Sequence, residues 1–189
     1  GVYDAKATLT LEGYKKLELT AQLTINKLNY DRSNARWDYE NEFTYNGVEQ
    51  TVEVVGLPQG VSAQYSDNAK IDAGSYVATA QLIYDTQNYN AISILDLNWK
   101  INKANITGIT FVSKNYEYDA QKHSLECVGN IPANSTVKIT YNDMEVDGVS
   151  EVGTYTVKLI ITNANYNTYE DTATLKITST EELLHSVVF

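Results

Sequence analysis

Apolar and polar residues alternate along three segments of the chain, each of which begins at a tyrosine. In residues 3–9 every second side chain is apolar and those between are polar. Every second residue of 76–84 and 155–161 is apolar as well, although Val77, Ile83 and Ile160 are apolar residues between them. Successive side chains of a β-strand point to opposite faces, so each segment predicts a strand with one apolar and one solvated face.

A second strand follows each of these segments after a turn that contains a further tyrosine. The three closing strands contain Ile25, Ile101 and Ile177, which are spaced 76 residues apart. A fixed spacing of this length indicates a tandem array in which each unit has its own core. The function should therefore be sought among the roles of repeat proteins.

A glycine followed two residues later by a tyrosine opens the first strand of each unit. Residues 72–76 read Asp-Ala-Gly-Ser-Tyr and resemble the tyrosine corner that opens strand F of immunoglobulin domains. In that corner the glycine permits the turn and the tyrosine hydroxyl bonds to upstream backbone. The resemblance assigns this structural role to Gly74, Tyr76, Gly153 and Tyr155.

Only one of the four residues at the two cysteine positions of an antibody domain is a cysteine in this chain. Ala78 and Val157 take the second position, whereas Val54 and Cys127 take the first. Cys127 is the only cysteine, so we interpret it as a small core residue rather than as half of a disulfide or a reactive thiol. We expect an all-β chain of tandem immunoglobulin-like β-sandwich modules with antiparallel strands and little or no helix.

The repeat divides the chain into four predicted parts. Residues 1–28 are the C-terminal hairpin of a truncated repeat, residues 29–102 and 103–178 are complete modules, and residues 179–189 are a tail. The hairpin carries an apolar face whose partner strands are missing from the sequence. We expect it to pack against the next module, the tail or a second copy of the chain, the last giving a homodimer.

Four motifs in a fixed order resemble the MBG-type repeat of bacterial surface proteins. They are Tyr45-Asn46-Gly47, residues 72–76, Asn88-Tyr89 and residues 101–104. The resemblance covers residues 29–178 as two modules, although Asp119-Ala120 replaces Asn-Gly in the second. It implies an extracellular, non-enzymatic role at the bacterial cell surface, either as a structural stalk or spacer or as an adhesin.

The charge of the chain limits its partners. The formal net charge is −10, and the 24 acidic residues are dispersed along the sequence. Binding to nucleic acid or to an anionic membrane needs clustered lysine and arginine, so neither is expected as a partner. No run of 18 apolar residues is present, so we expect no membrane insertion. The expected partners are neighbouring repeats and a glycan or protein ligand.

Catalytic and metal-binding residues do not form a recognisable pattern. His123 and His185 are the only histidines and stand in no catalytic or zinc motif, so we expect neither an enzyme nor a cofactor. Acidic residues crowd two equivalent loops, and the weak candidates for Ca²⁺ are Asp67, Asp72, Asp143 and Asp147. A solvated acidic surface explains the same residues.

A tyrosine flanked by asparagines recurs at one turn of both complete modules. The residues concerned are Tyr89 and Asn90 in the first module, and Tyr166 and Asn167 in the second. Tyrosine rings and amide groups can stack on sugars or anchor a protein, which favours a ligand contact. The alternative is structural: the ring packs over the end of the sandwich, and asparagine suits the turn.

Overall fold

The computed structural model describes residues 1–93 and 95–179, and these residues form strands, bridges, turns and irregular segments without a helix. The N-terminal hairpin consists of β1 (Val2–Leu9) and β2 (Leu17–Thr24). The middle repeat contains β3 (Arg36–Trp37), β4 (Phe43–Thr44), β5 (Gln50–Thr51), β6 (Val54–Val55), β7 (Ser62–Ser66), β8 (Ala69–Lys70), β9 (Gly74–Ile83) and β10 (Leu95–Asn102). The last repeat contains β11 (Ile109–Thr110), β12 (Lys114–Glu117), β13 (Val128–Gly129), β14 (Thr136–Tyr141), β15 (Gly153–Thr162) and β16 (Tyr169–Thr178). The predicted all-β fold is confirmed, and the predicted tail lies outside the described residues apart from Ser179.

The chain forms two compact units. The first contains residues Gly1–Glu40, Thr51–Ala69 and Tyr76–Trp99. The second contains Asn41–Gln50, Lys70–Ser75 and the described residues from Lys100 onward. One end of the middle repeat is thus grouped with the last repeat, so the repeat boundaries stay a prediction from sequence.

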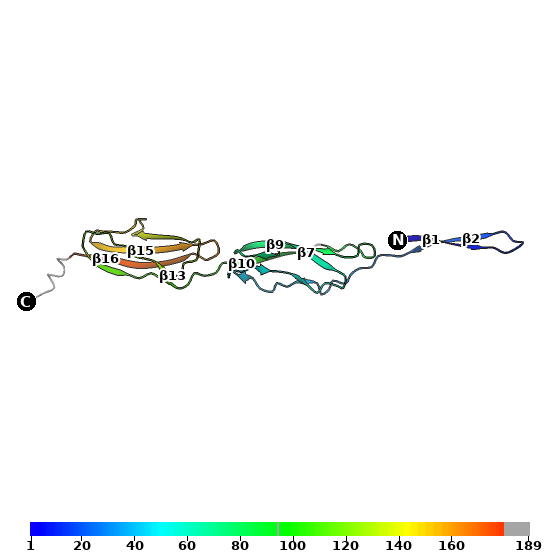
Figure 1. Cartoon of the computed structure of the whole chain (residues 1–189), viewed down its shortest axis with the longest axis horizontal. Helices are drawn as coiled ribbons and strands as arrows, with labels where there is room; N and C mark the ends of the chain where they lie inside the picture. Colours follow the sequence, from blue (N-terminus) through cyan, green and yellow to red (C-terminus); the bar gives the residue numbers. More distant parts are fainter. Residues whose placement is uncertain (94, 180–189) are drawn as a thin grey trace, which may run out of the picture. The chain divides into compact units, whose positions relative to one another are not determined.

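The N-terminal segment is an antiparallel hairpin of β1 and β2 (Figure 1, blue). Its register places Tyr3 opposite Leu23 and Leu9 opposite Leu17. Every residue of both strands is exposed. The hairpin is thus exposed among the residues of its own compact unit, and its expected packing against the next module, the tail or a second copy of the chain stays a prediction. The sequence shows which side chains share a face, but a covering layer depends on tertiary structure.

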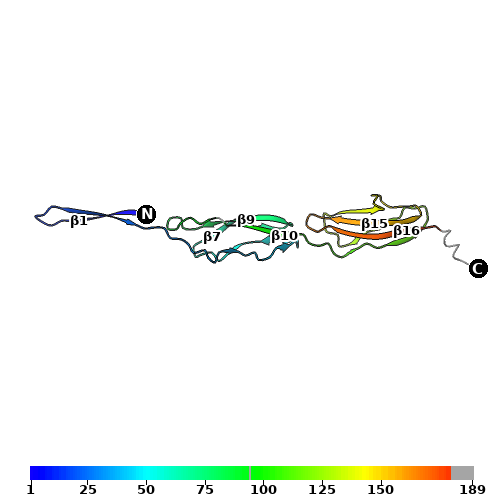
Figure 2. The ribbon, with the colours of Figure 1, turned by 180° about the vertical axis from the view of Figure 1, so that it is seen from behind.

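The last repeat shows how the same hairpin becomes part of a sandwich. Strands β15 and β16 run antiparallel in the centre of a sheet ordered β12-β16-β15-β14, and Figures 1 and 2 both show them side by side. Their inward side chains pack with residues of a second layer around β11 and β13. The buried cluster consists of Ile106, Phe111, Leu125, Tyr141, Val157, Leu159, Ile161, Ala173, Leu175 and Ile177. These apolar side chains form the core.

The middle repeat has a sheet of the same order, β4-β10-β9-β7, with the short pairs β3–β6 and β5–β8 beside it in the topology. Ala78, Ala80 and Ile101 are almost completely buried. Both sheets include one parallel pair at an edge, β4 with β10 and β12 with β16. An entirely antiparallel arrangement was expected, but side-chain alternation is identical for parallel and antiparallel strands and cannot distinguish them.

A tyrosine hydroxyl joins the two layers of each repeat. The hydroxyl of Tyr141 accepts a hydrogen bond from the backbone amide of Leu125 at 2.9 Å, and that of Tyr65 accepts one from the amide of Val54 at 2.9 Å. Each contact provides a backbone amide of the second layer, Leu125 in an irregular segment and Val54 in the two-residue strand β6, with a hydroxyl acceptor. Cys127 is half-buried beside the core, and burial, followed by the charge of Asp171, raises the pKa of its thiol.

Candidate functional site at the linkers

The turn at residues 165–167 holds the linker that precedes the last repeat. The amide of Ala104 donates to the carbonyl of Asn165 at 3.1 Å, and the amide of Asn167 donates to the carbonyl of Ala104 at 2.8 Å. The side-chain amide of Asn167 also donates to Oδ1 of Asn105 at 2.7 Å. These three bonds tie a segment that would otherwise be a free connection, and we call this arrangement the linker clamp.

The same clamp recurs one repeat earlier. The amide of Leu28 donates to the carbonyl of Asn88, and the amide of Asn90 donates to the carbonyl of Leu28. The side chain of Asn90 bonds to Oδ1 of Asn29 at 2.8 Å. Both clamps are completed by a parallel bridge to the central tyrosine, Leu28 to Tyr89 and Ala104 to Tyr166.

The tyrosine of each clamp is half-buried against other rings or the core. Tyr89 stacks on Tyr30 with ring centroids 3.8 Å apart and an interplanar angle of 17°. Tyr166 packs against the core of the last repeat and meets Tyr45 edge to face at 5.4 Å. The four residues considered for ligand contact therefore lie in the two clamps, where Asn90 and Asn167 have linker partners.

Within the second unit, Asn165 makes a further contact that the first clamp does not have. Its side-chain Oδ1 accepts a hydrogen bond from the amide of Ala73 at 2.8 Å, and its Nδ2 donates to Oδ1 of Asp72 at 2.9 Å. Both atoms of the amide group are thus used at once, which fixes the orientation of the side chain. Its counterpart Asn88 instead bonds to Asp85 within its own turn.

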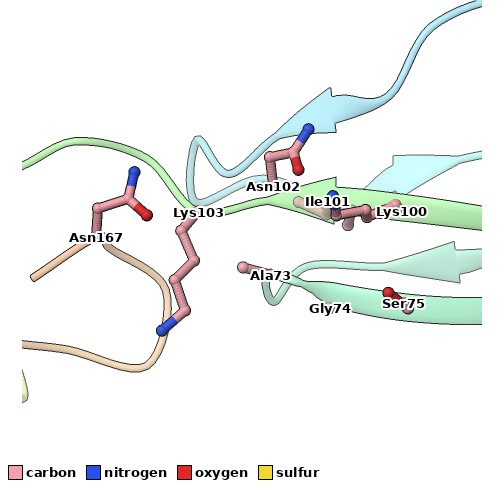
Figure 3. Close-up of a pocket in the computed structure, with 8 residues that line it drawn as sticks. All are labelled: Ala73, Gly74, Ser75, Lys100, Ile101, Asn102, Lys103 and Asn167. Carbon is pink, nitrogen blue, oxygen red and sulfur yellow. The ribbon is translucent and has the colours of Figure 1, made fainter.

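A hollow of about 500 Å³ lies beside this contact in the second unit (Figure 3). The residues that line it are Ala73, Gly74, Ser75, Lys100, Ile101, Asn102, Lys103 and Asn167. Figure 3 shows Lys103 extending from the linker between Ala73 and the loop that carries Asn167. The ammonium of Lys100 lies 3.4 Å from Glu42, which also accepts a bond from Asn102 at 2.8 Å. The lining offers amides and cations but no nucleophile positioned by a base.

In the last repeat the tyrosine of the predicted corner bonds to the backbone upstream, whereas neither Gly153 nor Gly74 has a positive φ. The hydroxyl of Tyr155 donates to the carbonyl of Glu151 at 2.9 Å, four residues upstream. Gly153 is the first residue of β15, and Gly74 has the same place in β9. Tyr76 packs on Trp99 with ring centroids 5.3 Å apart. These residues shape the ends of the sandwich and present no reactive group.

The four calcium candidates do not come together. Asp147 pairs with Lys122 at 2.6 Å, and Asp72 accepts the bond from Asn165. Asp67 and Asp143 occupy turns with positive φ of 54° and 65°. Among residues 1–93 and 95–179, no group of three or more histidine, cysteine or acidic side chains is arranged to hold a metal ion.

The side chain of His123 contacts residues of a neighbouring turn and strand. His123 lies 2.9 Å from Asp119 through Nε2, and its ring stacks on Tyr116 at 3.9 Å. The pKa of Asp119 is lowered, chiefly by the backbone amide of Gln121 and then by His123. His185 lies outside the described residues. Nor do the described residues contain a helix of the length and apolarity needed to cross a membrane.

The sequence pattern drew attention to the two Asn-Tyr-Asn turns, but it did not reveal that Asn90 and Asn167 bond to the linker residues Asn29 and Asn105. A usable signal was present, because an asparagine follows the linker position in both repeats, at Asn29 and Asn105. The contact of Asn165 with Asp72 joins residues 93 positions apart and has no local signal.

Comparisons with known proteins found similar chains among solved structures and one matching protein family. Among solved structures, an I-band fragment of titin is 12% identical over 77% of this chain and 66% of its own length, with a TM-score of 0.30. The fibronectin(III)-like modules of CbhA from Clostridium thermocellum are 8% identical over 78% of this chain and 95% of theirs, with a TM-score of 0.28. The chain thus spans slightly less than two thirds of the titin fragment. No curated protein sequence matches it. Residues 106–181 match the MBG domain family, which confirms the predicted resemblance for the last repeat; the four motifs named above, within residues 45–104, precede the matched span.

Proposed function

We propose that this chain is a set of non-enzymatic spacer repeats from a bacterial cell-surface protein, which hold a distal domain away from the cell. The observation that carries the proposal is the recurrence of the linker clamp before both complete repeats. A ligand site needs to be present only once, whereas an element that limits slack between repeats is needed at every linker.

The clamps suit a spacer because they shorten the free connection between repeats. In each clamp the linker residue, Leu28 or Ala104, donates one backbone hydrogen bond and accepts another. Only the few residues before it can therefore move as a flexible chain. In the second unit, Asn165 adds two hydrogen bonds to the loop at Asp72 and Ala73. The MBG match at residues 106–181 and the strongly acidic composition support an extracellular setting.

Single-molecule pulling on the whole chain tests the spacer role. We expect two separate unfolding events, because each complete repeat has its own core. Each event should release roughly 200–250 Å of chain, as expected for about 70 residues at up to 3.6 Å per residue. One cooperative event, or extension without a force peak, would contradict the proposal.

A second candidate function is adhesion, and one feature of the second unit favours it. A hollow of about 340 Å³ is lined by two tyrosines, Tyr45 and Tyr166, and by three asparagines, Asn134, Asn163 and Asn165. Aromatic faces beside amides are the chemistry that binds sugars. Binding of the chain to a glycan array, lost in Tyr45→Ala while the melting temperature is kept, would establish adhesion. An empty array would leave the spacer as the function.

A further inference from the structure

The two linker clamps differ in the lysine that comes just before each of them. The repeat spacing of 76 residues relates Lys27 to Lys103. The ammonium of Lys27 donates to the carbonyl of Thr86 at 2.7 Å, which ties this lysine to the turn of the first clamp. Lys103 is exposed, and its ammonium forms no hydrogen bond or ion pair with the part of the chain that the structure describes. The same repeat position thus holds a structural cation in one clamp and a free cation in the other.

The tyrosine rings of the two clamps differ as well. Tyr30 stacks on Tyr89 in the first clamp, with ring centroids 3.8 Å apart. The residue at the place of Tyr30 in the last repeat is Ile106, whose side chain belongs to the core. Within the described chain, Tyr166 meets another ring only edge to face, and it lines hollows of about 340 and 400 Å³. The second clamp, before the last repeat, therefore leaves aromatic surface open to a ligand.

The hollow that Lys103 lines adjoins the hollow with the two tyrosines. Ala73 lines the first and Asn165 the second, and a hydrogen bond of 2.8 Å joins them. Asn102 lines the first and Tyr45 the second, and the amide of Tyr45 donates to the carbonyl of Asn102 at 2.8 Å. Single hydrogen bonds thus separate about 500 Å³ from about 340 Å³. A ligand of several linked rings can reach both hollows.

The ammonium of Lys103 is not paired with an acid in this hollow (Figure 3). Lys100, the other cation of the lining, lies 3.4 Å from Glu42. Asp72 stands next to the hollow in sequence, and its carboxylate accepts the bond from Asn165. The remaining polar side chains of the lining are neutral: Ser75, Asn102 and Asn167. One free positive charge among neutral hydrogen-bonding groups suits a single carboxylate or sulfate, and it does not need the clustered cations that nucleic acid requires.

We propose that the second clamp binds an acidic oligosaccharide. Lys103 holds the anionic group of one sugar, and a neighbouring sugar ring lies against Tyr45 and Tyr166. The inference rests on adhesion as the function of the tyrosine hollow and names the class of glycan. The first clamp does not bind the same ligand, because Thr86 already holds its lysine and Tyr30 already covers its tyrosine.

NMR titration of the whole chain tests the site. The probe is an unsulfated chondroitin tetrasaccharide, in which a carboxylated sugar alternates with a neutral one. We expect it to shift the amides of residues 102–104 and 165–167 and to leave those of residues 27–29 and 88–90 unchanged. The same tetrasaccharide with its carboxyl groups methyl-esterified should bind roughly five-fold more weakly, because it lacks the charge that Lys103 binds.

A sulfated form of the tetrasaccharide identifies the anionic group. Tighter binding of this form would assign a sulfate to Lys103, whereas unchanged binding would assign the carboxylate. Both results agree with an anionic sugar at this position.

Variants of lysine distinguish this site from general attraction of an anion. Lys103→Gln should weaken binding of the acidic tetrasaccharide roughly five-fold and abolish its preference over the ester. Lys103→Arg keeps the charge and should restore the affinity to within about two-fold. The matched control is Lys176→Gln, which removes the same charge from an exposed position of β16 and should also stay within about two-fold. Because both lysines are exposed, the melting temperature should be unchanged in all three variants.

Three outcomes would overturn the inference. Equal affinity for the acid and the ester, lost in Tyr45→Ala, would keep adhesion but make the ligand a neutral glycan. Equal weakening by Lys103→Gln and Lys176→Gln would show that the anion is attracted without a site. Absence of binding to every tetrasaccharide, together with an empty glycan array, would contradict adhesion itself and leave the spacer role intact.

Discussion

The hairpins β1–β2 and β15–β16 share a sequence pattern and a strand register, yet they differ in what surrounds them. Leu175 in β16 is fully buried beneath a second layer, whereas its counterpart Leu23 in β2 is 57% exposed. Alternation and turn chemistry are therefore sufficient to pair two strands. Stability has to come from the layer that covers them, since burial of apolar area is the dominant favourable contribution to folding.

The largest difference should appear when the two corresponding leucines are truncated. Leu175→Ala should lower the free energy of unfolding by about 2–5 kcal/mol, because it removes buried methyl groups and leaves a cavity. Leu23→Ala should change it by less than about 0.5 kcal/mol. Urea unfolding of both variants measures this, and equal losses would show that the hairpin is already covered in solution.

A smaller effect should follow from removing the hydroxyl that joins the layers. Tyr141→Phe leaves the buried amide of Leu125 without its acceptor, so we expect a loss of about 1–3 kcal/mol. Tyr3→Phe is the matched control in the uncovered hairpin and should be neutral by thermal unfolding. A neutral Tyr141→Phe would mean that the amide finds another partner.

Asn165→Ala should sharpen the comparison between the two clamps. The amide of Ala73 loses its acceptor in this variant, and its hydrogen exchange should speed up by about five-fold or more, equivalent to roughly 1 kcal/mol. Asn88→Ala changes the corresponding residue of the other clamp and should leave Ala73 unchanged. The exchange rate of Ala73, followed by NMR, decides between these outcomes.

The smallest effect concerns pH. Lys16 and then Lys6 lower the pKa of Glu18 in the hairpin, and the amide of Gln121 lowers that of Asp119 in the last repeat. A lowered carboxyl pKa stabilises the fold above the ordinary values of 4.5 and 3.8, and this contribution is lost as the pH falls through the folded pKa. Stability should thus be flat from pH 8 to 5 and fall below about 4.

NMR titration of the two carboxyl groups checks these directions. In 1 M salt the pKa of Glu18 should return towards 4.5, because its ion pairs are exposed and screened. Asp119 should respond less, since its main partner is a neutral amide. A salt response of equal size would assign both shifts to long-range charge.

The long strands could be predicted because their evidence is local. Every residue pair needed to identify β9 or β15 lies within ten positions, and the glycine-tyrosine motif marks where each begins. The second layer could not be predicted in detail, because β5, β6 and β13 are only two residues long and show no periodicity. The Asn-Tyr-Asn turns stand out in the sequence, and their role as ligand contacts stays a prediction, whereas their partners in the linker could be found only from coordinates.

The amino-acid sequence determined that this chain is a tandem array of strands with apolar inner faces, because alternation and a fixed spacing are properties of neighbouring residues. Tertiary structure decided which faces are covered, which edge strands are parallel and where the amide of Asn165 is bound. Those outcomes depend on contacts between residues tens of positions apart. Such contacts are selected by packing and hydrogen-bond satisfaction in three dimensions, which no local pattern encodes.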